Sequence, residues 1–105
     1  MGILNRKMNP IDRAQHYIEQ LKDLKNKLAY VSEKLNTIKE SKNIDFDEYE
    51  RLFEKEFELS MALYSLHEDI HRILDYAKTQ DNEFMVKRLK KETDKIFKPI
   101  VINIA

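Results

Sequence analysis

The fold of this chain is decided by residues 11–40, which read IDRAQHYIEQLKDLKNKLAYVSEKLNTIKE. Apolar side chains recur here at alternating spacings of three and four residues, at Ala14, Tyr17, Leu21, Leu24, Leu28, Val31, Leu35 and Ile38. Such spacing places them on one narrow stripe of an α-helix, like the seam of a coiled coil, whereas a strand needs a period of two. Asn9 and Pro10 suit a helix start, because asparagine caps helices and proline fits the first helical position. The sequence therefore predicts a helix over about residues 10–41.

A second helix is predicted over about residues 46–79, after a turn at 41–45. Asp45 followed by Glu48 resembles a capping box, with aspartate in place of the usual serine or threonine. An apolar stripe again has helical spacing, at Leu52, Leu59, Leu63, Leu66, Ile70, Ile73 and Ala77. Beside the stripe lies a second apolar face, formed by Phe46, Phe53, Phe57 and Tyr64. A helix with so wide an apolar arc should contact more than one neighbour.

The charged side chains favour antiparallel pairing of these two helices. Lysines flank the first stripe, at Lys25, Lys27, Lys34 and Lys39. Glutamates occupy the start of the second helix, at Glu48, Glu50, Glu54, Glu56 and Glu58. A turn near Asn43 brings the two sets opposite each other, whereas parallel self-pairing of the first helix sets lysine against lysine. The sequence thus predicts a long antiparallel helical hairpin. The alternative is that these charges only solvate exposed faces.

A shorter third helix is predicted over about residues 82–97. Asp81 can cap its start, and Pro99 is expected to stop it. The apolar tail at 99–105 is expected to pack into a groove of this chain or of a partner. Because the third helix is only about half as long as the others, part of the second helix stays uncovered, and we expect dimerisation to complete a helical bundle. The predicted fold is all-α, in a single domain over residues 1–105.

The composition excludes several classes of protein. No cysteine means no disulfide and no thiolate metal site, and the single glycine, Gly2, rules out a glycine-rich phosphate loop. No apolar run approaches the roughly 20 residues that span a bilayer, and the first ten residues lack a secretory signal, so we expect a cytoplasmic protein. The 19 basic and 19 acidic side chains balance, which disfavours a dedicated nucleic-acid binder. The usage of lysine, isoleucine and asparagine is associated with AT-rich bacterial or phage genomes.

The sharpest chemical motif is HEDIH at residues 67–71. It resembles the H-E-x-x-H pattern of zinc metalloproteases, in which two histidines on one helical face bind Zn²⁺ and the glutamate activates water. The resemblance covers five residues, and Leu74 and Ala77 stand where one branch of that family has a glycine and its third histidine. An all-helical chain also offers no sheet for a substrate cleft. We therefore expect no enzymatic activity and no cofactor.

A second metal hypothesis combines His67 and His71 with His16. In a hairpin that turns near Asn43, His16 and His71 lie level, since each is about 27 residues from the turn. Three histidines from two helices would resemble the metal sites of DinB-like helical bundles. The simpler alternative places these histidines at the half-buried margin of a bundle, without a metal.

Exposed helical faces are the remaining candidates for function. The predicted partner-binding residues are aromatic in the second helix and basic in the third: Phe53, Phe57, Tyr64, Lys87, Arg88 and Lys91. The basic set could follow a phosphate backbone, but it lacks interleaved aromatics for base stacking and could equally be a solvated face. We expect a small non-enzymatic protein–protein interaction module, a regulator, inhibitor or adaptor of a larger bacterial or phage machine. The alternatives are a nucleic-acid-associated regulator and a metal-binding helical bundle.

Overall fold

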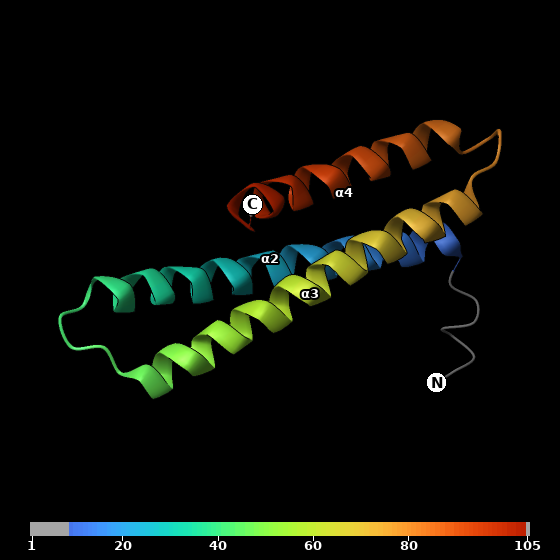
Figure 1. Ribbon diagram of the computed structural model, residues 1–105. Coiled ribbons are helices and arrows are strands. Elements are labelled where there is room, and N and C mark those ends of the chain that lie inside the picture. Colours follow the sequence, from blue (N-terminus) through green and yellow to red (C-terminus); the bar gives the residue numbers. More distant parts are fainter. Residues whose placement is uncertain (1–8, 105) are drawn as a thin grey trace.

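A computed structural model describes the backbone of residues 9–104 and the side chains of residues 9–97 (Figure 1). The chain forms three helices: α2 over Pro10–Glu40, α3 over Phe46–Ala77 and α4 over Glu83–Ile104. Residues 9–104 contain no strand, so the predicted all-α class is confirmed. Within this described part, no helix has the length and apolar character needed to cross a membrane.

Side-chain caps fix the points at which α2 and α3 begin. Asn9 Oδ1 accepts a 2.9 Å hydrogen bond from the backbone N–H of Asp12, and a proline follows the cap directly. Asp45 Oδ1 accepts hydrogen bonds from the backbone N–H groups of Asp47 and Glu48, at 3.1 and 3.3 Å. Each cap satisfies backbone donors that the first turn of a helix leaves unpaired. Both caps were predicted from the sequence, and both are confirmed.

The connection from α3 to α4 is fastened by Asn82. Its Oδ1 accepts from the backbone N–H of Thr79 at 2.6 Å, and its own N–H donates to Thr79 Oγ1 at 3.3 Å. Its Nδ2 donates to the carbonyl of Ala77, the last residue of α3, at 2.9 Å. The sequence predicted Asp81 as the cap of α4, whereas the side chain that ties this connection to the end of α3 is that of Asn82. An ionised aspartate has no donor for the Ala77 carbonyl, whereas the asparagine amide both donates and accepts.

Helix α4 continues to Ile104, beyond the predicted end at about residue 97. Pro99 has no N–H and so removes one backbone hydrogen bond, which weakens or kinks a helix without always ending it. The backbone of the predicted apolar tail is therefore helical up to Ile104. How the side chains of that tail pack lies outside the described residues.

The three helices share one apolar core. Helices α2 and α3 form an antiparallel hairpin, and α4 packs against both of them (Figure 1). The buried apolar side chains come from all three helices: Ala14, Ile18, Leu21, Leu28, Val31, Leu35, Leu59, Leu63, Ile70, Leu74, Val86, Leu89 and Phe97. Tyr17 and Leu24 of the predicted stripe are only partly buried, whereas Ile18 outside it is buried. Ile18 is buried because it faces α4, so α2 is covered on two sides rather than one.

The predicted lysine–glutamate pairing across the hairpin is not found. Among side chains 9–97, no ion pair joins α2 to α3, and Lys27 pairs instead with Asp23 of its own helix at 3.2 Å. The side-chain hydrogen bond between the two helices runs from Ser32 Oγ to Glu56 Oε2, at 2.7 Å. The antiparallel arrangement therefore rests on apolar burial, and the charges mainly solvate the outer faces.

Helix α4 lies in the trench between α2 and α3, starting at the end of the hairpin away from the 41–45 turn and running past its middle (Figure 1). On one side Glu92 pairs with Lys22 of α2 at 3.5 Å, and on the other Phe97 meets the ring of Tyr64 of α3 edge-on, with centroids 4.9 Å apart. At 1.5 Å per residue, α2 is about 46 Å long and α4 only about 33 Å. The trench is therefore longer than the helix that lies in it.

Candidate functional site

A groove of about 900 Å³ lies between α2 and α3, lined by residues between Lys25 and Lys39 of α2 and between Tyr49 and Tyr64 of α3. We call it the aromatic groove. Its α3 wall is made by Phe53, Phe57, Met61 and Tyr64, and its α2 wall includes Leu28 and Leu35. Tyr64 lines the groove and also touches Phe97 of α4. The groove is thus the direct continuation of the surface on which α4 packs.

The three aromatic residues predicted to bind a partner lie together in this groove. Phe53 is 54% exposed, Phe57 63% and Tyr64 41%. Scattered exposed apolar side chains are common on proteins, but several in one concave patch are typical of a binding surface. The α3 helix presents them because its apolar arc is wider than the face that packs on α2 and α4.

The aromatic groove also contains polar groups, among them the side chains of Asn36 and Ser60. Lys25 and Lys39 line it from α2, and the carboxylate of Glu56 already accepts the hydrogen bond from Ser32. The two lysines are the positively charged groups that line the groove and could meet an acidic side chain of a partner. The groove is therefore apolar along its α3 wall and basic along its α2 rim.

The predicted basic residues Lys87, Arg88 and Lys91 are exposed on α4 and do not line the aromatic groove. Acidic groups interrupt the basic stretch. Glu92 of the same helix pairs with Lys22, and Lys90 is hydrogen-bonded to Asp75 of α3. Lys90 is thereby paired with an acid, whereas none of the ion pairs among side chains 9–97 involves Lys87, Arg88 or Lys91.

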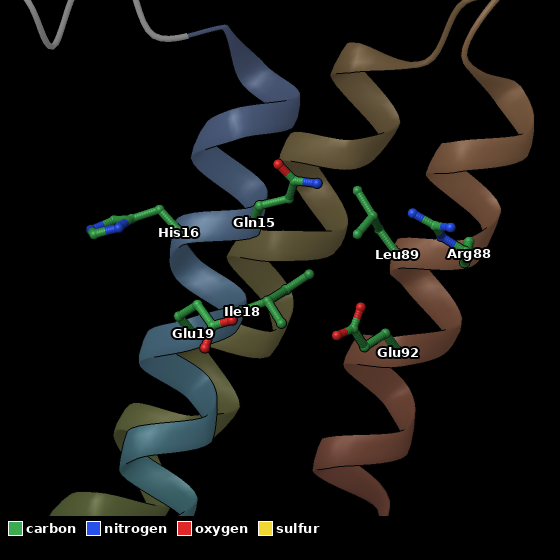
Figure 2. Close-up of a pocket in the computed structure, with 7 residues that line it drawn as sticks. All are labelled: Gln15, His16, Ile18, Glu19, Arg88, Leu89 and Glu92. Atoms are coloured by element: carbon green, nitrogen blue, oxygen red, sulfur yellow. The ribbon is translucent and has the colours of Figure 1, made fainter.

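The structure separates His16 from the other two histidines. His16 Nε2 lies 3.1 Å from the side-chain amide nitrogen of Gln20, one turn along α2. Figure 2 shows the His16 ring turned away from α4, at the edge of a shallow pocket of about 350 Å³ that Arg88 and Glu92 line from the other side. The sequence placed His16 level with His71 but did not fix which way its side chain points. It does not join the histidine cluster described next.

His67 and His71 lie one turn apart on α3, and both rings reach Asp94 of α4. The distances from Asp94 Oδ1 are 2.9 Å to His67 Nε2 and 2.7 Å to His71 Nε2. The ligand atoms of the three residues all lie within 4.8 Å of one another. We call these residues the two-histidine cluster. Partial burial raises the pKa of the Asp94 carboxyl, but the two histidine hydrogen bonds and charges outweigh it, so the pKa is lowered overall.

Sequence reasoning missed Asp94, although a signal was present. In a hairpin that turns near residue 80, Asp94 lies level with His67, since one is 14 residues after that point and the other 13 before it. Helix α4 looked like a plain basic helix, and nothing in its pattern singled out one acid.

Glu68, the central acid of the H-E-x-x-H motif, does not belong to the two-histidine cluster. Its Oε1 accepts a 3.1 Å hydrogen bond from the guanidinium of Arg72, one turn further along α3, and both side chains are exposed. Residues adjacent to His67 in a helix point about 100° away from it, so Glu68 faces a different side. The resemblance to zinc metalloproteases is thus limited to the two histidines.

Comparison of the chain with protein-family models, with curated proteins and with solved structures gives no match. What the protein can do must therefore be argued from its own side chains. Among the described residues, two features are candidate functional sites: the aromatic groove and the two-histidine cluster.

Proposed function

We propose that the chain is a small non-enzymatic protein–protein interaction module, which regulates, inhibits or adapts a larger protein by holding one of its helices in the aromatic groove. The observation that carries this proposal is the position of α4. It fills the neighbouring part of the same trench and contacts both α2 and α3. A surface that already accepts one apolar helical face is suited to a second helix placed end to end with the first.

The chemistry of the groove defines the partner helix. Its apolar face would insert side chains at helical spacing between Phe57 on one wall and Leu28 on the other. Acidic side chains at its edge would meet Lys25 and Lys39 on the α2 rim. The proposed occupant is therefore an amphipathic helix that carries acidic residues beside its apolar stripe.

A helix from a different protein fits the groove better than a second copy of this chain. A symmetric dimer places the same patch against itself, and two concave patches leave a void. Among side chains 9–97, the other large exposed apolar residues of α3 and α4 are Phe46 at the start of α3 and Tyr76, Phe84 and Met85 near the 78–82 connection. They lie at opposite ends of α3 and so form no single ridge that could fill the groove. Dimerisation, which the sequence led us to expect, stays a prediction that the same experiment checks.

The test is a photo-cross-link from inside the groove, made in the cells that express the protein. Replacing Phe57 with p-benzoylphenylalanine should give an adduct with one protein, at residues spaced three or four apart in a helix. The matched control is the same replacement at Tyr76, which is on the same helix, 85% exposed and outside the groove. An adduct with a second copy of this chain would show that the groove is a homodimer interface and would refute the proposed partner helix from another protein. Equal adducts from both positions would refute the groove as an interface.

The purified partner then allows a direct measurement. Phe57→Asp should weaken its binding by more than about 30-fold, because truncating an aromatic hot spot costs about 2 kcal/mol or more and a buried charge adds to that loss. Tyr76→Asp should leave the affinity within about twofold. Similar losses in both variants would count against the groove.

A further inference from the structure

The two-histidine cluster has the composition and the layout of a transition-metal site. Two imidazole nitrogens from adjacent turns of α3 and one carboxylate oxygen from α4 converge on a common point. Histidines four residues apart on a helix share one face, which is the spacing that lets two rings bind a single ion. Three protein ligands that leave a position open for water are typical of zinc sites with nitrogen and oxygen donors.

The distances are close to those that an ion needs. Ligand atoms that sit at about 2.1 Å from a tetrahedral zinc ion are about 3.4 Å apart. The two Nε2–Oδ1 distances are 2.9 and 2.7 Å, so they must open by about 0.5 and 0.7 Å. The Asp94 side chain is 55% exposed and has room to make this adjustment. Both Nε2 atoms already point at the carboxylate, so the ion would replace two shared protons without turning either ring.

Packing holds the imidazoles in place. The His67 ring stacks on Phe97, with centroids 4.1 Å apart and planes 22° from parallel, and the His67 and His71 centroids are 4.7 Å apart. Both histidine side chains are about three-quarters buried. A ligand whose orientation is fixed before the ion arrives loses little freedom on binding.

The donor set also defines which ions fit. Imidazole nitrogen suits Zn²⁺, Co²⁺ and Ni²⁺, whereas Mg²⁺ and Ca²⁺ prefer a shell of oxygen atoms, of which the cluster supplies only one carboxylate. We infer that His67, His71 and Asp94 bind one divalent transition-metal ion, with Zn²⁺ as the physiological candidate, and that this ion fastens α4 to α3. The inference does not depend on the function proposed for the aromatic groove.

The test is calorimetric titration of the full chain, without a histidine tag, with Zn²⁺ and separately with Mg²⁺. One Zn²⁺ should bind per chain and raise the midpoint of thermal unfolding, while Mg²⁺ should do neither. His71→Ala and Asp94→Asn should weaken zinc binding by more than about 100-fold, since losing even a group behind a ligand costs about 10–100-fold. His16→Ala is the matched control, because it removes a histidine that lies outside the cluster, and it should bind as the wild type does.

Wild-type affinity in Asp94→Asn would show that only the pair of histidines on α3 binds zinc, and it would overturn the three-ligand site. Equal affinities for His71→Ala and His16→Ala would overturn the site altogether. NMR of the wild-type protein is a second test, and it does not depend on the folding of any variant. The ring resonances of His67 and His71 should shift on adding Zn²⁺ while those of His16 do not, and a shift at His16 alone would refute the inference.

Discussion

Ser32 Oγ donates a 2.7 Å hydrogen bond to Glu56 Oε2 and so joins α2 to α3 within the aromatic groove. Both side chains are partly buried, so an unpaired Glu56 carboxylate would lose part of its solvation. We expect Ser32→Ala to lower the free energy of unfolding by about 1–2 kcal/mol relative to its control, because a hydrogen bond to a charged group is lost. The measurement is urea denaturation.

The control for Ser32→Ala is Ser65→Ala, at an exposed position of α3. Alanine favours a helix over serine by about 0.5 kcal/mol, and the control measures this gain separately. Equal effects of the two substitutions would show that the bond between Ser32 and Glu56 contributes nothing to stability.

Asn82 should matter more than its neighbour Asp81. Asn82→Ala removes the two hydrogen bonds that the Asn82 side chain makes with the Thr79 N–H and the Ala77 carbonyl, and we expect it to cost about 1 kcal/mol. Asp81→Ala changes an exposed side chain and should cost less than about 0.5 kcal/mol. Thermal unfolding of both variants compares them directly. A larger loss for Asp81→Ala would support the cap predicted from the sequence instead.

The core and the aromatic groove should respond differently to truncation. Leu63 is fully buried, so Leu63→Ala should cost about 2–5 kcal/mol through lost burial and the cavity left behind. Phe53→Ala removes a larger side chain, but one that is about half exposed, and should cost less than about 1 kcal/mol. Urea denaturation of the two variants gives the comparison. If Phe53→Ala proved as costly as Leu63→Ala, the groove wall would be structural, and its role in partner binding would lose support.

The pKa of Asp75 should depend on Lys90. A hydrogen bond from the Lys90 ammonium lowers the pKa of the Asp75 carboxyl below its ordinary value. Because the folded-state pKa then lies below the unfolded value of about 3.9, the pair stabilises the fold above that pH. This contribution is lost as the pH falls through the folded-state pKa. Carboxyl NMR titration of Lys90→Gln should show the pKa of Asp75 rising toward its ordinary range.

Salt provides the control for that titration. Both side chains reach solvent, so 1 M NaCl should screen the pair and raise the pKa of Asp75 in the wild type. In Lys90→Gln the same salt should change it much less. An Asp75 pKa that is equal in wild type and variant at low salt would contradict the assigned cause.

The sequence predicted the hairpin well because its signals are local. Helical spacing, the caps at Asn9 and Asp45 and the lack of internal breakers are all features of neighbouring residues. The predicted end of α4 was wrong for the same reason. The rule that proline stops a helix considers only the local backbone and ignores the packing of the rest of the helix. The predicted charge pairing across the hairpin was also wrong. The sequence gives the level of a lysine along its helix but not the direction of its flexible side chain.

The candidate sites were predictable only in part. The three aromatic residues of α3 could be found because a wide apolar arc is visible within one helix. The residue that contacts the two histidines could not be predicted from the pattern within one helix, since it depends on how α3 and α4 are rotated about their own axes. Counting from the second turn gives the level of Asp94, but it gives Glu92 nearly the same level and does not say which of the two acids faces the histidines. His16 was favoured by its level and excluded by its direction (Figure 2).

The short connections at 41–45 and 78–82 bear on how fast the chain folds. Each joins two helices that pack side by side, so most of the core forms by closing small loops rather than by bringing distant segments together. Loop closure is the slow, entropically costly part of finding a native topology, and helical proteins with mainly local contacts fold in microseconds to milliseconds. We expect this chain to fold in that range, with the docking of α4 against α2 as its longest-range event.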